Sequence, residues 1–163
     1  MAEPILTDHE IKTLEPQSTL AVRVRVPMDQ LDLGALFATV LPRLQAVATD
    51  GGPPYGRYHE FGPTQADVEI GIPVGDVSLD LPDQDVGEHP IEPSELPGGP
   101  TAVAIHHGSY ETLGPAYDRL HDWIHSQGHD EGPGPWESYL DLPDEVEDEA
   151  SLRTVLHWPL RGR

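Results

Sequence analysis

Two short segments, PYGRY at residues 54–58 and PWESY at residues 135–139, share a proline, an aromatic residue and a tyrosine at the same spacing. Each follows a glycine-rich break. Each also precedes an apolar stretch with a central proline, Ile-Pro-Val at 72–74 and Trp-Pro-Leu at 158–160. Recurrence of such motifs in the same order is typical of an internal duplication. The two segments therefore divide the chain into two similar halves.

The residues around these segments predict the same order of elements twice. Alternating apolar and basic residues predict a first strand, in which Arg23 and Arg25 face outward. Apolar residues at helical spacing then predict a helix that Asp32 caps and that Pro42 kinks or restarts. The first half is expected to contain a strand over 20–26, a helix over 32–49 and strands over 55–61 and 68–74. The second half is expected to contain a strand over 101–107, a helix over 112–127 and strands over 136–142 and 152–160.

Residues 75–100 separate the two halves and differ from both in composition. They contain seven acidic residues, five prolines, four glycines and no Lys or Arg, which predicts a loop or an edge-strand connection. We expect one domain over residues 1–163, with one repeat over about 18–75 and the other over about 101–162. The fold class is α+β: two βαββ units paired about a pseudo-two-fold axis form an antiparallel sheet with two main helices and a central cleft.

The composition excludes several classes of function. The chain has no cysteine, which excludes disulfides, thiolate metal sites and cysteine nucleophiles. Its formal net charge of −20 argues against direct binding to nucleic acid. We find no apolar run of about 18 residues and no secretion signal at the start, so we expect a cytoplasmic protein without membrane contact. The acidity fits either a salt-adapted cytoplasm or an ordinary acidic protein.

Further motifs occur in a fixed order and make the sequence similar to a known family. They are GSYxxLxxxYxxLxxW over 108–123, PWESYL over 135–140, Arg-Thr at 153–154 before Pro159, LPGGP over 96–100, Tyr58, and Ile-Pro-Val at 72–74. With these motifs the sequence resembles the GyrI-like family over about residues 18–162.

The resemblance implies two βαββ halves with a cleft between them. In multidrug-sensing transcription regulators, domains of this kind bind lipophilic cations through aromatic side chains and a buried glutamate. Stand-alone members include gyrase-inhibitor-like proteins, plain binders, and enzymes that hydrolyse the cyclopropane ring of DNA-alkylating natural products. This sequence contains no recognisable DNA-reading segment, so it resembles a stand-alone member.

The carboxylate in question is predicted to be Glu137. It lies inside a predicted strand, two residues before Tyr139, so both side chains point to the same face of the sheet. A carboxylate in an apolar site must be paired or change its pKa, and a cationic ligand is one suitable partner. The alternative is a structural ion pair of Glu137 with Arg57 or Arg153 on an exposed sheet face.

Aromatic residues near the two strands are the other candidates for ligand contact. Tyr58 matches Tyr139 in the other repeat, so the two tyrosines are candidates for opposite walls of the cleft, although for each tyrosine taken alone a core position is favoured. Tyr110, Trp158 and Tyr55 complete the predicted ligand-binding set. Trp136 is expected to face away from Glu137 into the core, and Trp123 is expected to be buried on the helix.

Histidines on the second predicted helix raise the question of a metal site. His121 and His125 are four residues apart and share a face with Asp118. They lie on a predicted solvent-facing flank, no recognisable motif supplies a third ligand, and His129 follows the helix-ending Gly128. We therefore predict neither a metal nor a cofactor.

Three functions are compatible with these residues. The first is a module that binds a small lipophilic, cationic or planar aromatic molecule without changing it. The second is an enzyme that opens cyclopropane rings, with Glu137 as general base and Tyr139 or Tyr110 as hydrogen-bond donor to the substrate. The third is a gyrase-inhibitor-like interaction protein whose acidity imitates DNA. We favour the binding module over the enzyme, and rank the gyrase partner last.

Overall fold

The chain forms two compact units, and it passes from one unit to the other twice. The computed structural model describes residues 5–47, 53–74, 91–132, 134–141 and 146–161. One unit, here the central unit, is Pro16–Pro97; the other, the terminal unit, combines Met1–Glu15 with Gly98–Arg163. Each unit contains four antiparallel strands and one main helix.

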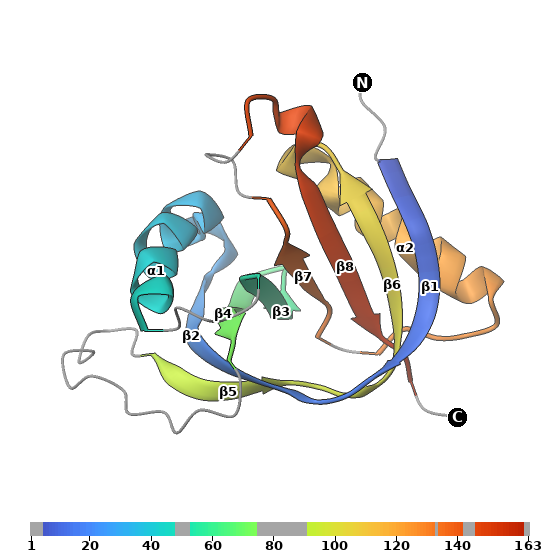
Figure 1. Cartoon of the computed structure of the whole chain (residues 1–163), viewed down its shortest axis with the longest axis horizontal. Coiled ribbons are helices and arrows are strands. Elements are labelled where there is room, and N and C mark those ends of the chain that lie inside the picture. Colours follow the sequence, from blue (N-terminus) through green and yellow to red (C-terminus); the bar gives the residue numbers. More distant parts are fainter. Residues whose placement is uncertain (1–4, 48–52, 75–90, 133, 142–145, 162–163) are drawn as a thin grey trace. The chain divides into compact units, whose positions relative to one another are not determined.

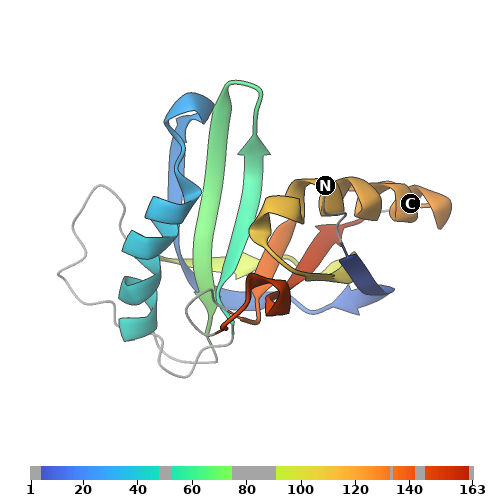
Figure 2. The ribbon, with the colours of Figure 1, turned by 90° about the horizontal axis from the view of Figure 1, so that it is seen from above.

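The central unit has the strand order β3-β4-β2-β5 (Figure 1). Its elements are β2 (Gln17–Pro27), the short helix η1 (Met28–Gln30), α1 (Leu33–Val47), β3 (Tyr55–Phe61), β4 (Gln65–Pro73) and β5 (Glu92–Leu96). Helix α1 runs alongside β2 and β4 (Figure 2). Alternate residues of β2 and β4 therefore face α1, and with Val40 and Leu44 they form the buried apolar core of this unit.

Local chemistry explains the first strand and helix of the central unit. Arg23 and Arg25 are exposed on β2, as predicted, and both donate hydrogen bonds to Asp67 on β4. The hydrogen bond from Arg23 is the main reason that the pKa of Asp67 falls to about 2. The Asp32 carboxylate accepts a hydrogen bond of 3.0 Å from the backbone N–H of Ala35, which confirms the predicted cap.

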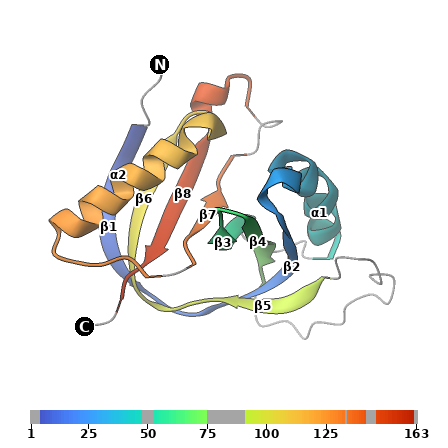
Figure 3. The ribbon, with the colours of Figure 1, turned by 180° about the vertical axis from the view of Figure 1, so that it is seen from behind.

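The terminal unit has the strand order β1-β6-β8-β7. Its elements are β1 (Ile5–Leu14), β6 (Gly99–His107), η2 (Tyr110–Thr112), α2 (Leu113–Ser126), β7 (Trp136–Tyr139), η4 (Glu149–Ser151) and β8 (Arg153–Pro159). Helix α2 crosses one face of this sheet (Figure 3). The apolar core between them comprises Ala102, Ala104, Ala116, Leu120, Ile124, Leu156 and Leu160.

Both units use the same order of strand, helix, strand and strand, with one further strand at an edge. The pairing register is also equivalent: Tyr55 lies opposite Gly71 in the central unit, and Trp136 lies opposite His157 in the terminal unit. These are the positions that the alignment of 54–58 with 135–139 matches. The predicted α+β class with two βαββ units is confirmed.

The sequence analysis missed the edge strand β1 and misjudged the burial of Trp123, whereas β5 lies in the connection for which a loop or an edge strand was predicted. No element was predicted over β1, where the positive φ of Asp8 (56°) and a register shift between Thr7 and Glu10 interrupt the alternation of side chains. Of the two alternatives predicted at Pro42, a kink or a restart, the restart does not occur, because α1 continues through this residue. Trp123 is only partly buried and packs against the edge of the core beside His9.

Some predictions fall on residues outside the described ranges. They include residues 48–49 of the first helix, the Gly-Gly pair at 51–52, residues 75–90 of the acidic connection and Leu142 of the strand predicted over 136–142. Among the described residues, no helix combines the length and apolarity that a membrane crossing requires.

Gly71 offers a test of packing in the central unit. A Cβ built at this position would come within 2.5–2.7 Å of the Tyr55 ring, which is fully buried and held by a hydrogen bond with Thr19. We expect Gly71→Ala to lower the free energy of unfolding by about 1–3 kcal/mol, because the ring must move. Urea unfolding measures the change.

Gly114→Ala is the matched control, because no atom lies within 4 Å of a Cβ at this helical position. It should be neutral or stabilise α2, since alanine favours helix more than glycine does. Equal stability of Gly71→Ala and the wild-type protein would contradict the tight packing of Tyr55.

Candidate functional site

Glu137 is a buried acid in the terminal unit, with only 1% of its surface exposed. It lies on β7 opposite Leu156 of β8, and Leu156 belongs to the apolar core between the sheet and α2. Side chains directly opposite each other in an antiparallel pair point to the same face. The carboxylate of Glu137 therefore lies on the sheet face that α2 covers.

Two tyrosine hydroxyl groups bind this carboxylate. Tyr117, on α2, donates to Oε1 of Glu137 at 2.9 Å, and Tyr139, on β7, donates to Oε2 at 2.9 Å. Because both oxygens accept a hydrogen bond, the arrangement suits the ionised form of the acid. The shared face of Glu137 and Tyr139, predicted from their spacing, is confirmed by this contact.

Two more aromatic rings continue the cluster on either side. Tyr110 meets the ring of Tyr139 edge to face, with the ring centroids 5.7 Å apart. Trp158 meets Tyr117 in the same way, also at 5.7 Å, and its indole N–H donates to the backbone oxygen of Gly132. Two tyrosines thus hold the carboxylate and two further aromatic rings pack against those tyrosines. We call these five residues the Glu137 cluster.

The turn after β6 places Tyr110 and the start of α2. Gly108 has a φ of 119°, a conformation that other residues rarely adopt, and η2 follows directly. Nε2 of the buried His106 lies 2.7 Å from the Thr112 hydroxyl, which ties the end of β6 to the residue before α2. The Tyr110 hydroxyl donates to the backbone oxygen of Asp141 at 3.4 Å.

The structure brings together four of the six predicted ligand-binding residues: Glu137, Tyr139, Tyr110 and Trp158. Tyr117 was missed as a partner, because its helical spacing with Trp123 indicated only a core position. The sequence did contain a signal for Tyr117, since it is the second tyrosine of the motif GSYxxLxxxYxxLxxW over 108–123. The predicted alternative that pairs Arg153 with Glu137 differs from the structure, in which Arg153 binds Asp141 at 2.9 Å.

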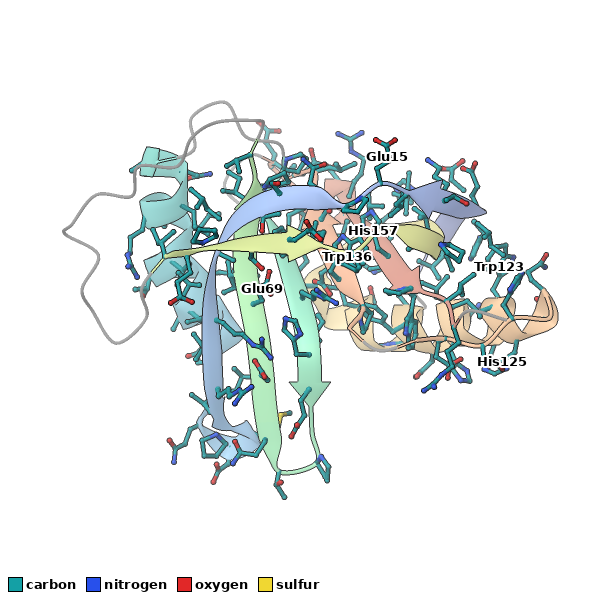
Figure 4. All side chains as sticks on the ribbon, turned by 90° about the horizontal axis from the view of Figure 1, so that it is seen from below. Glu15, Glu69, Trp123, His125, Trp136 and His157 are labelled. Atoms are coloured by element: carbon teal, nitrogen blue, oxygen red, sulfur yellow. The ribbon has the colours of Figure 1, made fainter. Side chains whose placement is uncertain are left out.

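Trp136 lies on the opposite face of β7, as expected. It is 3% exposed, and its ring stacks on that of His157 with the centroids 4.8 Å apart and the planes 6° from parallel. Figure 4 shows the two side chains close together. Trp136 therefore belongs to the packing of the sheet and not to the Glu137 cluster.

The remaining two predicted residues, Tyr55 and Tyr58, belong to the central unit. Tyr58 is partly buried and packs against the apolar core of that unit. Tyr55 is fully buried, and its hydroxyl contacts Thr19 and donates to Glu69. A role of either tyrosine in ligand binding stays a prediction.

Glu69 is a second buried acid, which the sequence analysis overlooked although it also lies inside a predicted strand. Besides Tyr55, its carboxylate contacts His59 at 2.8 Å and Ser94 at 3.0 Å. Desolvation raises the pKa of Glu69, but the hydrogen bonds from His59, Tyr55 and Ser94 lower it further, so the net shift is downward. Burial, followed by the nearby Glu69, raises the pKa of Tyr55 strongly. These contacts make Glu69 a satisfied structural acid.

One protein family matches nearly the whole sequence. The family described as the GyrI-like small molecule binding domain matches residues 7–161. No curated protein matches the sequence.

Solved structures with similar folds include EcmrR, SAV2435 and a protein titled a hydrolase. The EcmrR C-terminal domain is 21% identical, with a TM-score of 0.74, and the match covers 96% of this chain and 98% of that one. In the EcmrR–DNA complex the match has 23% identity and a TM-score of 0.73, and it covers 96% of this chain but 58% of EcmrR.

SAV2435 bound to tetraphenylphosphonium is 12% identical, with a TM-score of 0.67 and coverage of 96% and 95% of the two chains. A protein titled a hydrolase, from Listeria innocua, is 15% identical, with a TM-score of 0.64 and coverage of 94% and 91%. At these identities the likeness concerns the fold alone.

Proposed function

Because the chain belongs to the family of GyrI-like small molecule binding domains, we propose that it binds a lipophilic, cationic small molecule at the Glu137 cluster. The observation that carries this proposal is the buried carboxylate that two tyrosines hold among four aromatic rings. The protein would bind such a compound without altering it, as a multidrug-binding or sequestering protein.

Charge is the first part of the physical argument. Transfer of an organic cation from water to an apolar site is costly unless an anion is close. Glu137 is 1% exposed, so its interaction with a nearby cation is weakened much less by water and salt than a surface contact would be. This favours cations over neutral compounds of the same shape.

Aromatic rings are the second part. Tyr110, Tyr117 and Trp158 are each partly exposed and not fully buried. A cation over such a ring gains about 0.5–2 kcal/mol. The solved structure of SAV2435 with tetraphenylphosphonium, which shares the fold, supports an aryl cation of this type as the first probe.

Tetraphenylphosphonium and tetraphenylborate test the proposal, because they have nearly the same shape and opposite charges. We expect calorimetry to show that the protein binds the cation at least about tenfold more tightly than the anion, equivalent to about 1.4 kcal/mol. The measurement is repeated at high salt, because the chain's net charge of −20 attracts any cation to its surface.

A preference for the cation that persists at high salt supports a buried site. A preference that disappears with salt, or equal binding of the two ions, would contradict the proposal.

Hydrolysis of a strained ring is the second candidate function, and the fold shared with the Listeria innocua protein titled a hydrolase favours keeping it. A general base must reach the proton of a water molecule. Both oxygens of Glu137 already accept tyrosine hydrogens, so a water would have to displace one of them. For this reason we rank binding first.

A further inference from the structure

A second group of polar side chains lies toward the end of α2, where the ring of His121 meets that of Trp158 in the Glu137 cluster with the centroids 6.1 Å apart. His121 and His125 are one helical turn apart, and Glu131 lies just beyond the helix, where it forms an isolated bridge with Leu160. Figure 4 shows His125 projecting from α2. Glu131 supplies the third ligand that no sequence motif indicated. Asp118, which was expected to share a helix face with the two histidines, does not belong to this group.

The three side chains converge on one point. Nε2 of His121 lies 3.2 Å from Oε1 of Glu131, and Nε2 of His125 lies 2.7 Å from Oε2. One ligand atom from each of the three residues lies within 4.8 Å of the others. Ligands about 2.0–2.1 Å from a tetrahedral zinc ion are about 3.3 Å apart, so small side-chain rotations suffice to surround an ion.

Each imidazole ring also has a carboxylate near its other nitrogen. Nδ1 of His121 points to Asp122 at 3.5 Å, and Nδ1 of His125 points to Asp130 at 3.8 Å. Histidines that bind metals with one nitrogen commonly present the other to a carboxylate, which fixes the tautomer and the ring orientation. In both residues it is therefore Nε2 that faces Glu131 and would bind the ion.

We propose that His121, His125 and Glu131 bind one divalent transition-metal ion, for which Zn²⁺ is the best fit. Two imidazoles and one carboxylate suit zinc and its neighbours nickel and cobalt, whereas calcium and magnesium prefer sites made of oxygen atoms. Three protein ligands leave a position for water, since all three side chains are partly exposed, with 28–44% of each accessible. The inference does not depend on the proposed function.

Zinc titration of the full chain, prepared without a histidine tag and first treated with a chelator, tests the site. We expect calorimetry to show one Zn²⁺ bound per chain, and Co²⁺ to give the visible absorption bands of a four-coordinate site. His121→Ala and Glu131→Gln should each weaken Zn²⁺ binding at least about tenfold. Acidification should release the ion, because its ligands must lose their protons.

His129→Ala is the matched control: it removes a histidine of the same segment that lies outside the three-residue group. It should bind Zn²⁺ as the wild-type protein does, and melting curves without metal verify that each variant is folded. The proposal is wrong if no stoichiometric binding occurs, or if the substitutions at His121 and Glu131 leave the affinity unchanged. The exposed acids of the chain would then account for any binding.

Discussion

Glu137→Gln should weaken the binding of tetraphenylphosphonium about 100-fold, or about 2.7 kcal/mol, while a neutral aryl compound such as triphenylphosphine oxide loses far less. The substitution preserves the shape of the side chain and removes only its charge. The amide oxygen can still accept a hydrogen bond from one of the two tyrosines that hold the carboxylate, Tyr117 and Tyr139, and the other hydroxyl can turn to accept one. The loss therefore reports the charge on the buried acid.

Glu147→Gln is the control for net charge, because it removes the same charge from an exposed residue. Its affinity for the cation should remain within about a factor of two of the wild-type value, since exposed charges contribute little in salt. Calorimetry at physiological salt compares the three proteins. If Glu137→Gln binds the cation as tightly as the wild-type protein does, the charge of Glu137 has no part in recognition.

Stability should fall sharply in mild acid because of His157. Desolvation by burial lowers the pKa of this histidine to about 4, and its Nδ1 has no hydrogen-bond partner among the described residues. In the unfolded chain the pKa returns to about 6.5. Between pH 6.5 and pH 4 the unfolded state therefore binds more protons, so the free energy of unfolding rises with pH over this range.

The difference between a pKa of about 6.5 in the unfolded chain and about 4 in the folded protein corresponds to up to about 3 kcal/mol in the free energy of unfolding. The stability is present in full above pH 6.5 and is lost as the pH falls to 4. Urea unfolding at several pH values measures it. His157→Phe retains a ring that can stack on Trp136 but has no titrating group, so its stability should depend much less on pH in this range.

His129→Phe is the comparison for the pH experiment and should retain the wild-type pH dependence. If His157→Phe and the wild-type protein lose the same free energy between pH 6.5 and pH 4, the acid sensitivity arises from other groups. His106, whose pKa burial also lowers, would be the next residue to replace.

The family and the main elements were predictable from the sequence. The motifs around Tyr110, Tyr117 and the PWESYL segment indicated the GyrI-like family, and the match over residues 7–161 confirms it. The six predicted strands and two predicted helices all occur, with shifted ends; the second predicted strand of the second half ends at Tyr139. Their periodicity depends on neighbouring residues, which is why it can be read without a structure.

The sequence by itself also determined which side chains share a face. Glu137 and Tyr139 are two residues apart in a strand, and Arg23 and Arg25 alternate with apolar neighbours, so their directions follow from the geometry of an extended chain. No knowledge of the rest of the molecule is needed for these assignments.

Only the tertiary structure decided which distant residues meet. Tyr117 reaches Glu137 because α2 packs across the sheet, and Glu131 approaches His121 and His125 because the chain returns to Leu160 after the helix ends. Strand β1 joins the sheet of a unit that resumes at Gly98. Contacts of this kind depend on how whole elements dock, and docking is set by the summed burial of many side chains and not by any local pattern.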